Sequence, residues 1–179
     1  MGAILQRFLQ TLRLEREAYV WMDFNDRATG DALVLVAITG LLKFMGFFGG
    51  LRSLFNVGAW DLLISFALAA LIQWLLYSAI AWALVRFLIQ GSGDYATYLR
   101  FTGFAYPTTL LVLAFAIAMN SRGWVPFALG FVWFIFIIGR GIEYESDLPR
   151  DRALLVAVGA LGGLLVVDAI FKFSPIIWT

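Results

Sequence analysis

The chain contains no cysteine and no histidine among its 179 residues. Without cysteine there can be no disulfide and no thiol chemistry. Without histidine the usual general base, the usual metal ligand and the usual pH switch are missing. Both absences argue against an enzyme and leave only carboxylate chemistry open. We therefore expect a protein that is not an enzyme and holds neither a metal nor another cofactor.

Charged residues are also scarce, at 14% of the chain, where a soluble domain has about a quarter. Hydrophobic residues make up 62% and aromatic residues 17%. The formal net charge is only +1, so nothing indicates a nucleic acid as partner. This composition predicts an integral membrane protein whose main partner is the lipid bilayer.

The longest apolar stretch is Leu62–Ile89, which has 28 residues and neither glycine nor proline. As a helix it would reach about 42 Å, whereas the hydrocarbon core of a bilayer is about 30 Å thick. It is apolar around its whole circumference, as only a buried or membrane-spanning helix is. We expect it to span the membrane, with Gln73 forming a hydrogen bond to a neighbouring helix.

Four further stretches are apolar enough to cross a bilayer, and the third of the five spans should bend or break at Pro107. The chain is thus predicted to be all-α, a polytopic membrane protein with five transmembrane helices. Its expected parts are a cytoplasmic N-terminal segment (1–31), a five-span domain (32–173) and a short extracytoplasmic tail (174–179). The four further spans are Ala32–Phe48, Phe101–Met119, Trp124–Ile138 and Ala153–Phe171.

The N-terminal residues Met1–Tyr19 have the apolar periodicity of one amphipathic helix. Such a helix either lies in the membrane interface or packs on the rest of the protein, and the sequence leaves both possibilities open. A polar connector over residues 21–30 follows, with Asp31 as the expected cap of the first span.

The distribution of basic residues predicts the orientation, because cytoplasmic loops carry the excess of Lys and Arg. Nine of the 13 basic residues fall on the side of the N-terminus. The N-terminus should therefore be cytoplasmic and the C-terminus outside. The nine are Arg7, Arg13, Arg16, Arg27, Arg86, Arg100, Arg140, Arg150 and Arg152.

Two segments dominate the expected cytoplasmic face, residues 90–107 and 139–153, and we interpret both as loops. Their features resemble those of the Yip family, five-span membrane proteins named for their interaction with Ypt/Rab GTPases. The resemblance covers residues 14–172 and rests on Gly91 and Gly93, on Tyr98-Leu99-Arg100, on Gly103-Phe104-Ala105-Tyr106-Pro107, on Trp133 and on Ala153-Leu154-Leu155.

Two departures limit what this resemblance implies. Eukaryotic Yip proteins have a long cytosolic N-terminal region with an Asp-Leu-Tyr-Gly-Pro motif, whereas this chain has about 31 residues there and lacks the motif. The family's Gly-Tyr pair is replaced by Gly103-Phe104. A Rab-type GTPase partner is therefore not supported. The compact form resembles the prokaryotic branch, which implies a bacterial or archaeal cytoplasmic membrane.

The string Gly91-Ser92-Gly93-Asp94 matches the GxGD motif of intramembrane aspartyl proteases. That chemistry needs a second carboxylate close to Asp94. The simpler interpretation is that Asp94 caps a short helix over Tyr95–Arg100. The candidates for a second carboxylate are Glu143, Glu145, Asp147 and Asp151.

The charged segment from Arg140 to Arg152 can form a cation site or a docking surface, but a self-neutralising solvated loop is the simpler interpretation. Its mixed signs make it a poor polybasic lipid patch. Asp147 should cap the last helix, with Pro149 in the first turn.

Gly159 and Gly163 form a small-xxx-small pair in the last span. Such a pair either drives homo-oligomerisation or lets another span of the same chain pack closely, and we favour the second.

The sequence thus predicts a non-enzymatic membrane protein of the Yip type that organises membrane or recruits partners through its cytoplasmic loops. The alternatives are a small transporter, channel or lipid-handling protein and, more remotely, an aspartyl protease. Partner or ligand contacts are expected at Gly91, Gly93, Asp94, Arg100, Gly103, Tyr106, Pro107, Arg140, Glu143 and Asp147.

Overall fold

The structure is a computed structural model that describes residues 2–47, 59–120 and 124–171, and all secondary structure within these ranges is helical. Five helical stretches are long and apolar enough to cross a membrane. The prediction of an all-α protein with five spans is therefore confirmed. The stretches are Arg27–Gly46, Leu63–Ile89, Tyr95–Ala118, Val125–Ser146 and Arg150–Phe171.

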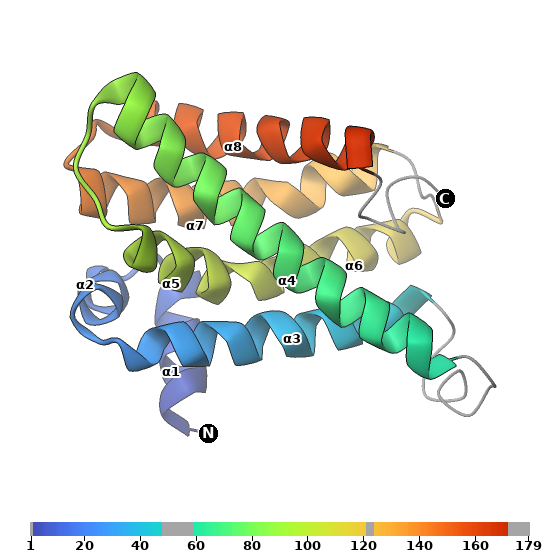
Figure 1. Cartoon of the computed structure of the whole chain (residues 1–179). Coiled ribbons are helices and arrows are strands. Elements are labelled where there is room, and N and C mark those ends of the chain that lie inside the picture. Colours follow the sequence, from blue (N-terminus) through green and yellow to red (C-terminus); the bar gives the residue numbers. More distant parts are fainter. Residues whose placement is uncertain (1, 48–58, 121–123, 172–179) are drawn as a thin grey trace.

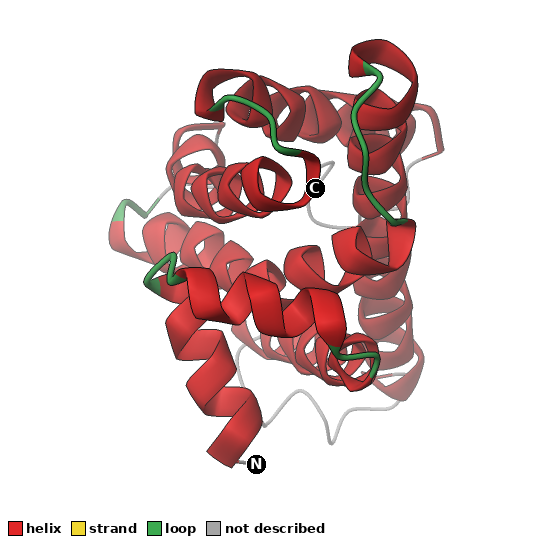
Figure 2. Cartoon of the chain, turned by 90° about the vertical axis from the view of Figure 1, so that its left-hand side faces the viewer, coloured by secondary structure: helices red, strands yellow, loops and turns green. Residues whose placement is uncertain are grey.

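The spans run back and forth between two ends of a bundle (Figure 1). The end that carries the N-terminal helices and the connections at residues 90–94 and 147–149 is called the N-terminal end, and Figure 2 views it face on. The last span leads away from it, so the described chain starts and finishes at opposite ends. The elements that build the spans are α3 (Arg27–Phe47), α4 (Ala59–Ala83) with the π-helical turn η2 (Leu84–Ile89), α5 (Tyr95–Ala105), the 3₁₀ turn η3 (Tyr106–Thr109), α6 (Leu110–Ala118), α7 (Trp124–Ser146) and α8 (Arg150–Phe171).

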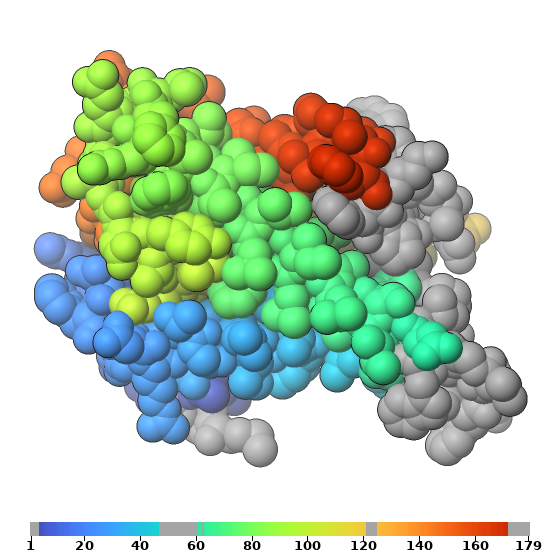
Figure 3. All heavy atoms as spheres, viewed as in Figure 1, coloured from blue at the N-terminus to red at the C-terminus, as the bar shows by residue number. Residues whose placement is uncertain are grey.

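Helix α5 is the centre of the bundle, since it contacts α3, α4 and α7 as well as both N-terminal helices. Eight of its eleven residues are buried, among them Tyr98, Phe101 and Phe104. The long helix α4 runs diagonally over the face shown in Figure 3, from the side of α8 to that of α3, and packs on α3, α5 and α8. The longest apolar helix is therefore a peripheral one, and the shorter and more polar α5 forms the core.

Large apolar side chains point outward from the spans at helical spacing. On α3, for example, Leu33, Val34, Ile38 and Leu42 are exposed, while Ala32, Val36 and Thr39 are buried. In water such faces would be unstable, but in a bilayer they meet acyl chains of the same polarity. The bundle is thus built to be surrounded by lipid.

Several polar side chains within the spans are paired inside the protein, as a medium without water favours. The Trp74 indole N–H donates to the Leu99 carbonyl at 3.0 Å and to Thr102 Oγ1 at 3.1 Å. The Tyr77 hydroxyl donates to the Ala157 carbonyl at 2.9 Å, which ties α4 to α8. These bonds hold the inner face of α4 to its neighbours.

The N-terminal segment differs from the prediction, because it forms two helices rather than one. Helix α1 (Gly2–Leu12) ends where Leu14 adopts a left-handed conformation with φ 58°, and α2 (Arg16–Phe24) follows at an angle. The Leu14 N–H bonds to the Thr11 carbonyl and the Glu15 N–H to the Gln10 carbonyl, both at 3.0 Å. This is the Schellman pattern that closes helix C-termini, usually with glycine at the left-handed position. A leucine there gave no sequence signal for the break.

Two span boundaries also differ from the prediction. Helix α3 begins at Arg27, so Asp31 lies inside it and does not cap it; the Asn25 side chain instead accepts a hydrogen bond from the Arg27 N–H at 3.1 Å. Helix α7 continues to Ser146, so only residues 147–149 connect it to α8. Pro149 directly precedes the first turn of α8 and its carbonyl accepts the Ala153 N–H.

Some predicted features lie outside the described residues. They are the connection through Gly49, Gly50, Arg52 and Asn56, most of the turn at residues 120–123, and the tail from Lys172.

Candidate functional site

The candidate site is built on Arg100, which is 6% exposed and reaches from α5 to the junction of α2 and α3. Its Nη1 donates to the carbonyls of Met22 and Asp23, both at 2.9 Å. Its Nε donates to Thr29 Oγ1 at 3.0 Å, and its Nη2 pairs with Asp26 Oδ1 at 2.6 Å. We call these five residues the Arg100 clamp.

The clamp follows from what a helix end lacks. The carbonyls of Met22 and Asp23 belong to the last turn of α2, where carbonyl oxygens find no N–H donors within the helix and carry partial negative charge. A guanidinium presents several N–H donors in one plane and can satisfy such a cluster, which an ammonium cannot do as well. Arg100 therefore fastens the end of α2 and the start of α3 to the centre of the bundle.

A second set of contacts holds the connection over residues 90–94. The Glu145 carboxylate on α7 accepts the backbone N–H of Asp94 at 2.9 Å, and the Trp82 indole donates to the Gly93 carbonyl at 3.2 Å. Gly93 has φ +140°, a conformation that side-chain-bearing residues rarely adopt, and an added Cβ would lie 2.9 Å from Tyr98. Both the conformation and the space therefore require glycine here.

Asp94 stands at the N-cap position of α5 but forms no side-chain capping bond. The expected capping role is therefore wrong, and Glu145 supplies an acceptor at the start of α5 instead. Of the four proposed partners for a GxGD carboxylate pair, Glu145 is the one that this geometry brings next to Asp94. Its Oε1 is bonded to the backbone of Asp94, which is a structural role.

Residues 95–105 form helix α5, which agrees with the helix expected over Tyr95–Arg100 and with the expected third span, and α5 and η3 continue directly into α6 as one span. The loop expected to reach residue 107 is therefore wrong, since only residues 90–94 connect the second span to the third. Gly103 lies inside the bundle, where an added Cβ would come 2.5 Å from the Ala32 Cβ. Pro107 lies in the 3₁₀ turn η3, at the predicted irregularity. Gly103 and Tyr106 are buried and Pro107 is half-buried, and all three lie within a membrane span that a cytoplasmic partner does not reach.

A chain of polar groups crosses the bundle at this irregularity. The Tyr106 hydroxyl donates to Gln73 Oε1 at 3.1 Å, which joins the third span to α4. On the other side of Tyr106, the Lys43 ammonium lies 4.6 Å from the ring centroid, within the range of a cation–π interaction. Gln73 thus makes an interhelical hydrogen bond of the expected kind.

Arg140 and Glu143 are not in a loop, because helix α7 extends to Ser146. Three positions apart on this helix, their side chains form an ion pair at 2.5 Å. Arg140 also donates to the Tyr144 hydroxyl at 2.7 Å. The neighbouring Tyr19 hydroxyl donates to the Ile137 carbonyl, and burial raises the pKa of Tyr19 above its ordinary value, so it remains a neutral donor. Asp147 lies in the short connection to α8, with φ 50°.

Gly163 faces α4 and Gly159 lies next to the turn η2 within the same chain. A Cβ added at Gly163 would lie 3.0 Å from Ile80, and one at Gly159 would lie 3.4 Å from Leu84. Gly163 therefore lies in an intramolecular contact between α4 and α8, whereas Gly159 is exposed and only touches η2.

Arg100 and Asp94 were therefore identified from sequence, whereas their partners were not. The clamp partners lie 71 to 78 positions away from Arg100. Two of them, Met22 and Asp23, accept through backbone carbonyls, which every residue has, so their residue types do not indicate the contact. The sequence singles out Glu145 as a candidate second carboxylate and as part of a charged segment, not as an acceptor for the Asp94 backbone.

A five-span, all-helical bundle with lipid-facing apolar surfaces and internally paired polar groups defines an integral membrane protein. The family model of the Yip1 domain matches residues 17–170, which is most of the chain. The chain therefore belongs to the Yip1 domain family, as the sequence resemblance indicated. Comparison with curated proteins and with solved structures gave no match.

Proposed function

We propose that this Yip1 domain protein is a non-enzymatic membrane protein that recruits partners, or organises membrane, at the N-terminal end of the bundle. The observation that supports the proposal is the Arg100 clamp, because it ties the end of α2 to the centre of the bundle, on which the N-terminal helices form a platform. The accessible part of the platform is smaller than the sequence suggested. It consists of α1, α2 and the connections at 90–94 and 147–149.

The outer surface of this platform is amphipathic. Leu5, Leu9, Val20 and Phe24 are exposed, the last of them 84%, while Phe8 and Leu12 pack on the core. One side of the N-terminal segment packs on the rest of the protein, and the other side is exposed and available to the membrane interface. Both roles considered for this amphipathic segment are therefore compatible with its structure. Placed at the headgroup level, the free apolar side chains would insert into the membrane interface.

Orientation is part of this proposal, with the N-terminal end in the cytoplasm of a bacterial or archaeal cell. A reporter that is active only in the cytoplasm should therefore be silent when fused to the C-terminus and active when fused to the N-terminus. The physical reason is the excess of basic residues on the N-terminal side. The reverse activity pattern would overturn the orientation.

Site-specific cross-linking in cells tests recruitment. A photoreactive residue at Ser92, exposed in the 90–94 connection, should yield adducts with another protein. The matched control is Asn120, which is also polar and exposed but lies at the opposite end of the bundle. Adducts that are the same at both positions, or absent from both, would contradict the proposal.

The second candidate function is transport, which is favoured by the polar chain of Lys43, Tyr106 and Gln73 inside the bundle. It predicts solute or ion flux into proteoliposomes that is lost in Gln73→Leu. Such a flux, in the absence of adducts at Ser92, would replace the recruitment proposal by transport.

A further inference from the structure

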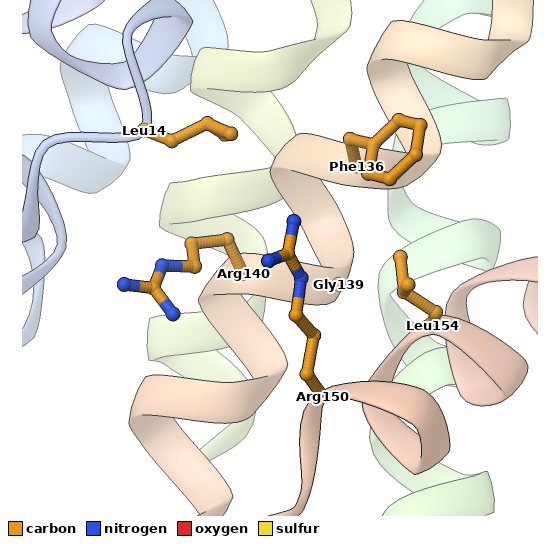
Figure 4. A pocket seen from close by; sticks show the side chains of 6 residues that line it. All are labelled: Leu14, Phe136, Gly139, Arg140, Arg150 and Leu154. Carbon is orange, nitrogen blue, oxygen red and sulfur yellow. The ribbon is translucent and has the colours of Figure 1, made fainter.

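A pocket of about 200 Å³ opens between α7, α8 and the turn at Leu14 that separates α1 from α2. Leu14, Phe136, Gly139 and Leu154 supply its apolar lining, and Arg140 and Arg150 supply its charged lining. Figure 4 shows the Arg150 side chain extending from the start of α8 to a position between Arg140 and Leu154. The pocket is thus apolar on one side and cationic on the other.

The two arginines differ in how their charges are used. Arg140 is paired with Glu143 and bonded to the Tyr144 hydroxyl. Within the described part of the chain, Arg150 has no ion pair and no hydrogen bond from its side chain. Glu145, a second carboxylate of this segment, is bonded to Asp94. The charged segment from Arg140 to Arg152 is therefore not fully self-neutralising, because the Arg150 guanidinium at the pocket has no carboxylate partner among the described residues.

The position of the pocket matches the boundary of a bilayer. Arg150 is the first residue of the fifth span, and the fourth span ends at Ser146, so both spans leave the apolar region near this level. A guanidinium at that depth faces lipid phosphates, to which it can donate two parallel hydrogen bonds.

An apolar path leads from the pocket along the outside of α7. Phe136 lines the pocket and is 36% exposed, and Trp133, Val132 and Leu129 continue the exposed surface toward the opposite end of the bundle. Gly139 permits the close approach of α8 at the base of the pocket, since an added Cβ would lie 2.6 Å from Leu154. A ligand with a phosphate and an attached acyl chain would meet both surfaces at once.

We propose that this pocket binds the phosphate headgroup of an anionic phospholipid, with one acyl chain lying along α7. Arg150 contacts the phosphate, while Arg140 contributes a charge already compensated by Glu143. This site goes beyond the proposed recruitment function: it borders the platform at Leu14 and Arg150 but uses neither the Arg100 clamp nor the 90–94 connection.

The test is native mass spectrometry of the purified protein in detergent, titrated with phosphatidylglycerol. Wild type should retain bound lipid saturably, and phosphatidylcholine should bind more weakly. Loss of a charge-assisted hydrogen bond predicts about tenfold weaker binding in Arg150→Gln, and a larger loss in Arg150→Glu. Melting temperatures without lipid show that the variants remain folded.

Arg152→Gln is the matched control, because it removes the same charge from the same helix at an exposed residue that does not line the pocket. Its affinity should stay near that of wild type. Equal losses in Arg150→Gln and Arg152→Gln would show a diffuse charge effect and would overturn the proposal. Excess inorganic phosphate should not displace the lipid; complete displacement would indicate an anion site without a lipid component and would overturn it as well.

Discussion

Replacing Arg100 by Gln should destabilise the protein by about 3 kcal/mol, in the range found when one partner of a buried charged network is removed. The guanidinium is nearly buried, and four hydrogen bonds to the junction of α2 and α3 depend on it. The carbonyls of Met22 and Asp23 would be left without this donor. Thermal unfolding in detergent measures the loss.

A local measurement separates release of the N-terminal helices from general unfolding. In Arg100→Gln, trypsin should cut at Arg13 and Arg16 much faster than in wild type, before the spans unfold. Asp26→Asn is the informative control, because the Asp26 side chain is fully exposed and its ion pair is screened by solvent. It should leave stability and cleavage nearly unchanged. If the cleavage rate in Arg100→Gln equals that of wild type, the clamp does not hold the N-terminal helices.

The second large effect is expected at Gly130 on α7. A Cβ added there would lie 2.4 Å from Cγ2 of Val112 and 2.5 Å from the backbone N and Cα of the same residue. A flexible side chain can move away, but the backbone of α6 cannot move without shifting a whole helix. Gly130→Ala should therefore cost about 3 kcal/mol, the upper part of the usual range for overpacking.

Gly162→Ala provides the control, since a Cβ added at this glycine of α8 would meet nothing within 4 Å. Alanine has the higher helix propensity, so this variant should be as stable as wild type or more stable by about 0.5–1 kcal/mol. Unfolding of both variants in the same detergent checks the pair. Equal stability of Gly130→Ala and Gly162→Ala would show that α6 and α7 do not approach as closely as the structure describes.

The five spans were predictable because each must be apolar along its length, and that requirement is visible in local sequence. Their ends were less predictable. The fourth span was expected to stop at Ile138, because Arg140 and Glu143 interrupt the apolar run, but the two side chains pair three positions apart on the surface of α7. Charged residues that neutralise each other on one helix face do not end the helix.

The irregular features of the backbone were predicted only where the residue type demanded them. Pro107 marked the 3₁₀ turn, since proline removes an N–H donor from the helix. Leu14 gave no such indication, because a leucine in the left-handed conformation is stabilised by the surrounding contacts and not by its own preference.

By itself, the sequence determined that this is an integral membrane protein with five spans and that it is of the Yip type. These conclusions rest on composition, span length and short motifs, which are local properties of the sequence. The tertiary structure alone decided that α5, and not the longest apolar helix, is central, and that Arg100 holds the N-terminal helices. It also decided that Arg150, without an ion pair in the part of the chain that the structure describes, lines a pocket at the lipid boundary. These outcomes depend on contacts between residues far apart in the chain, often through backbone atoms that every residue shares, so no local pattern records them.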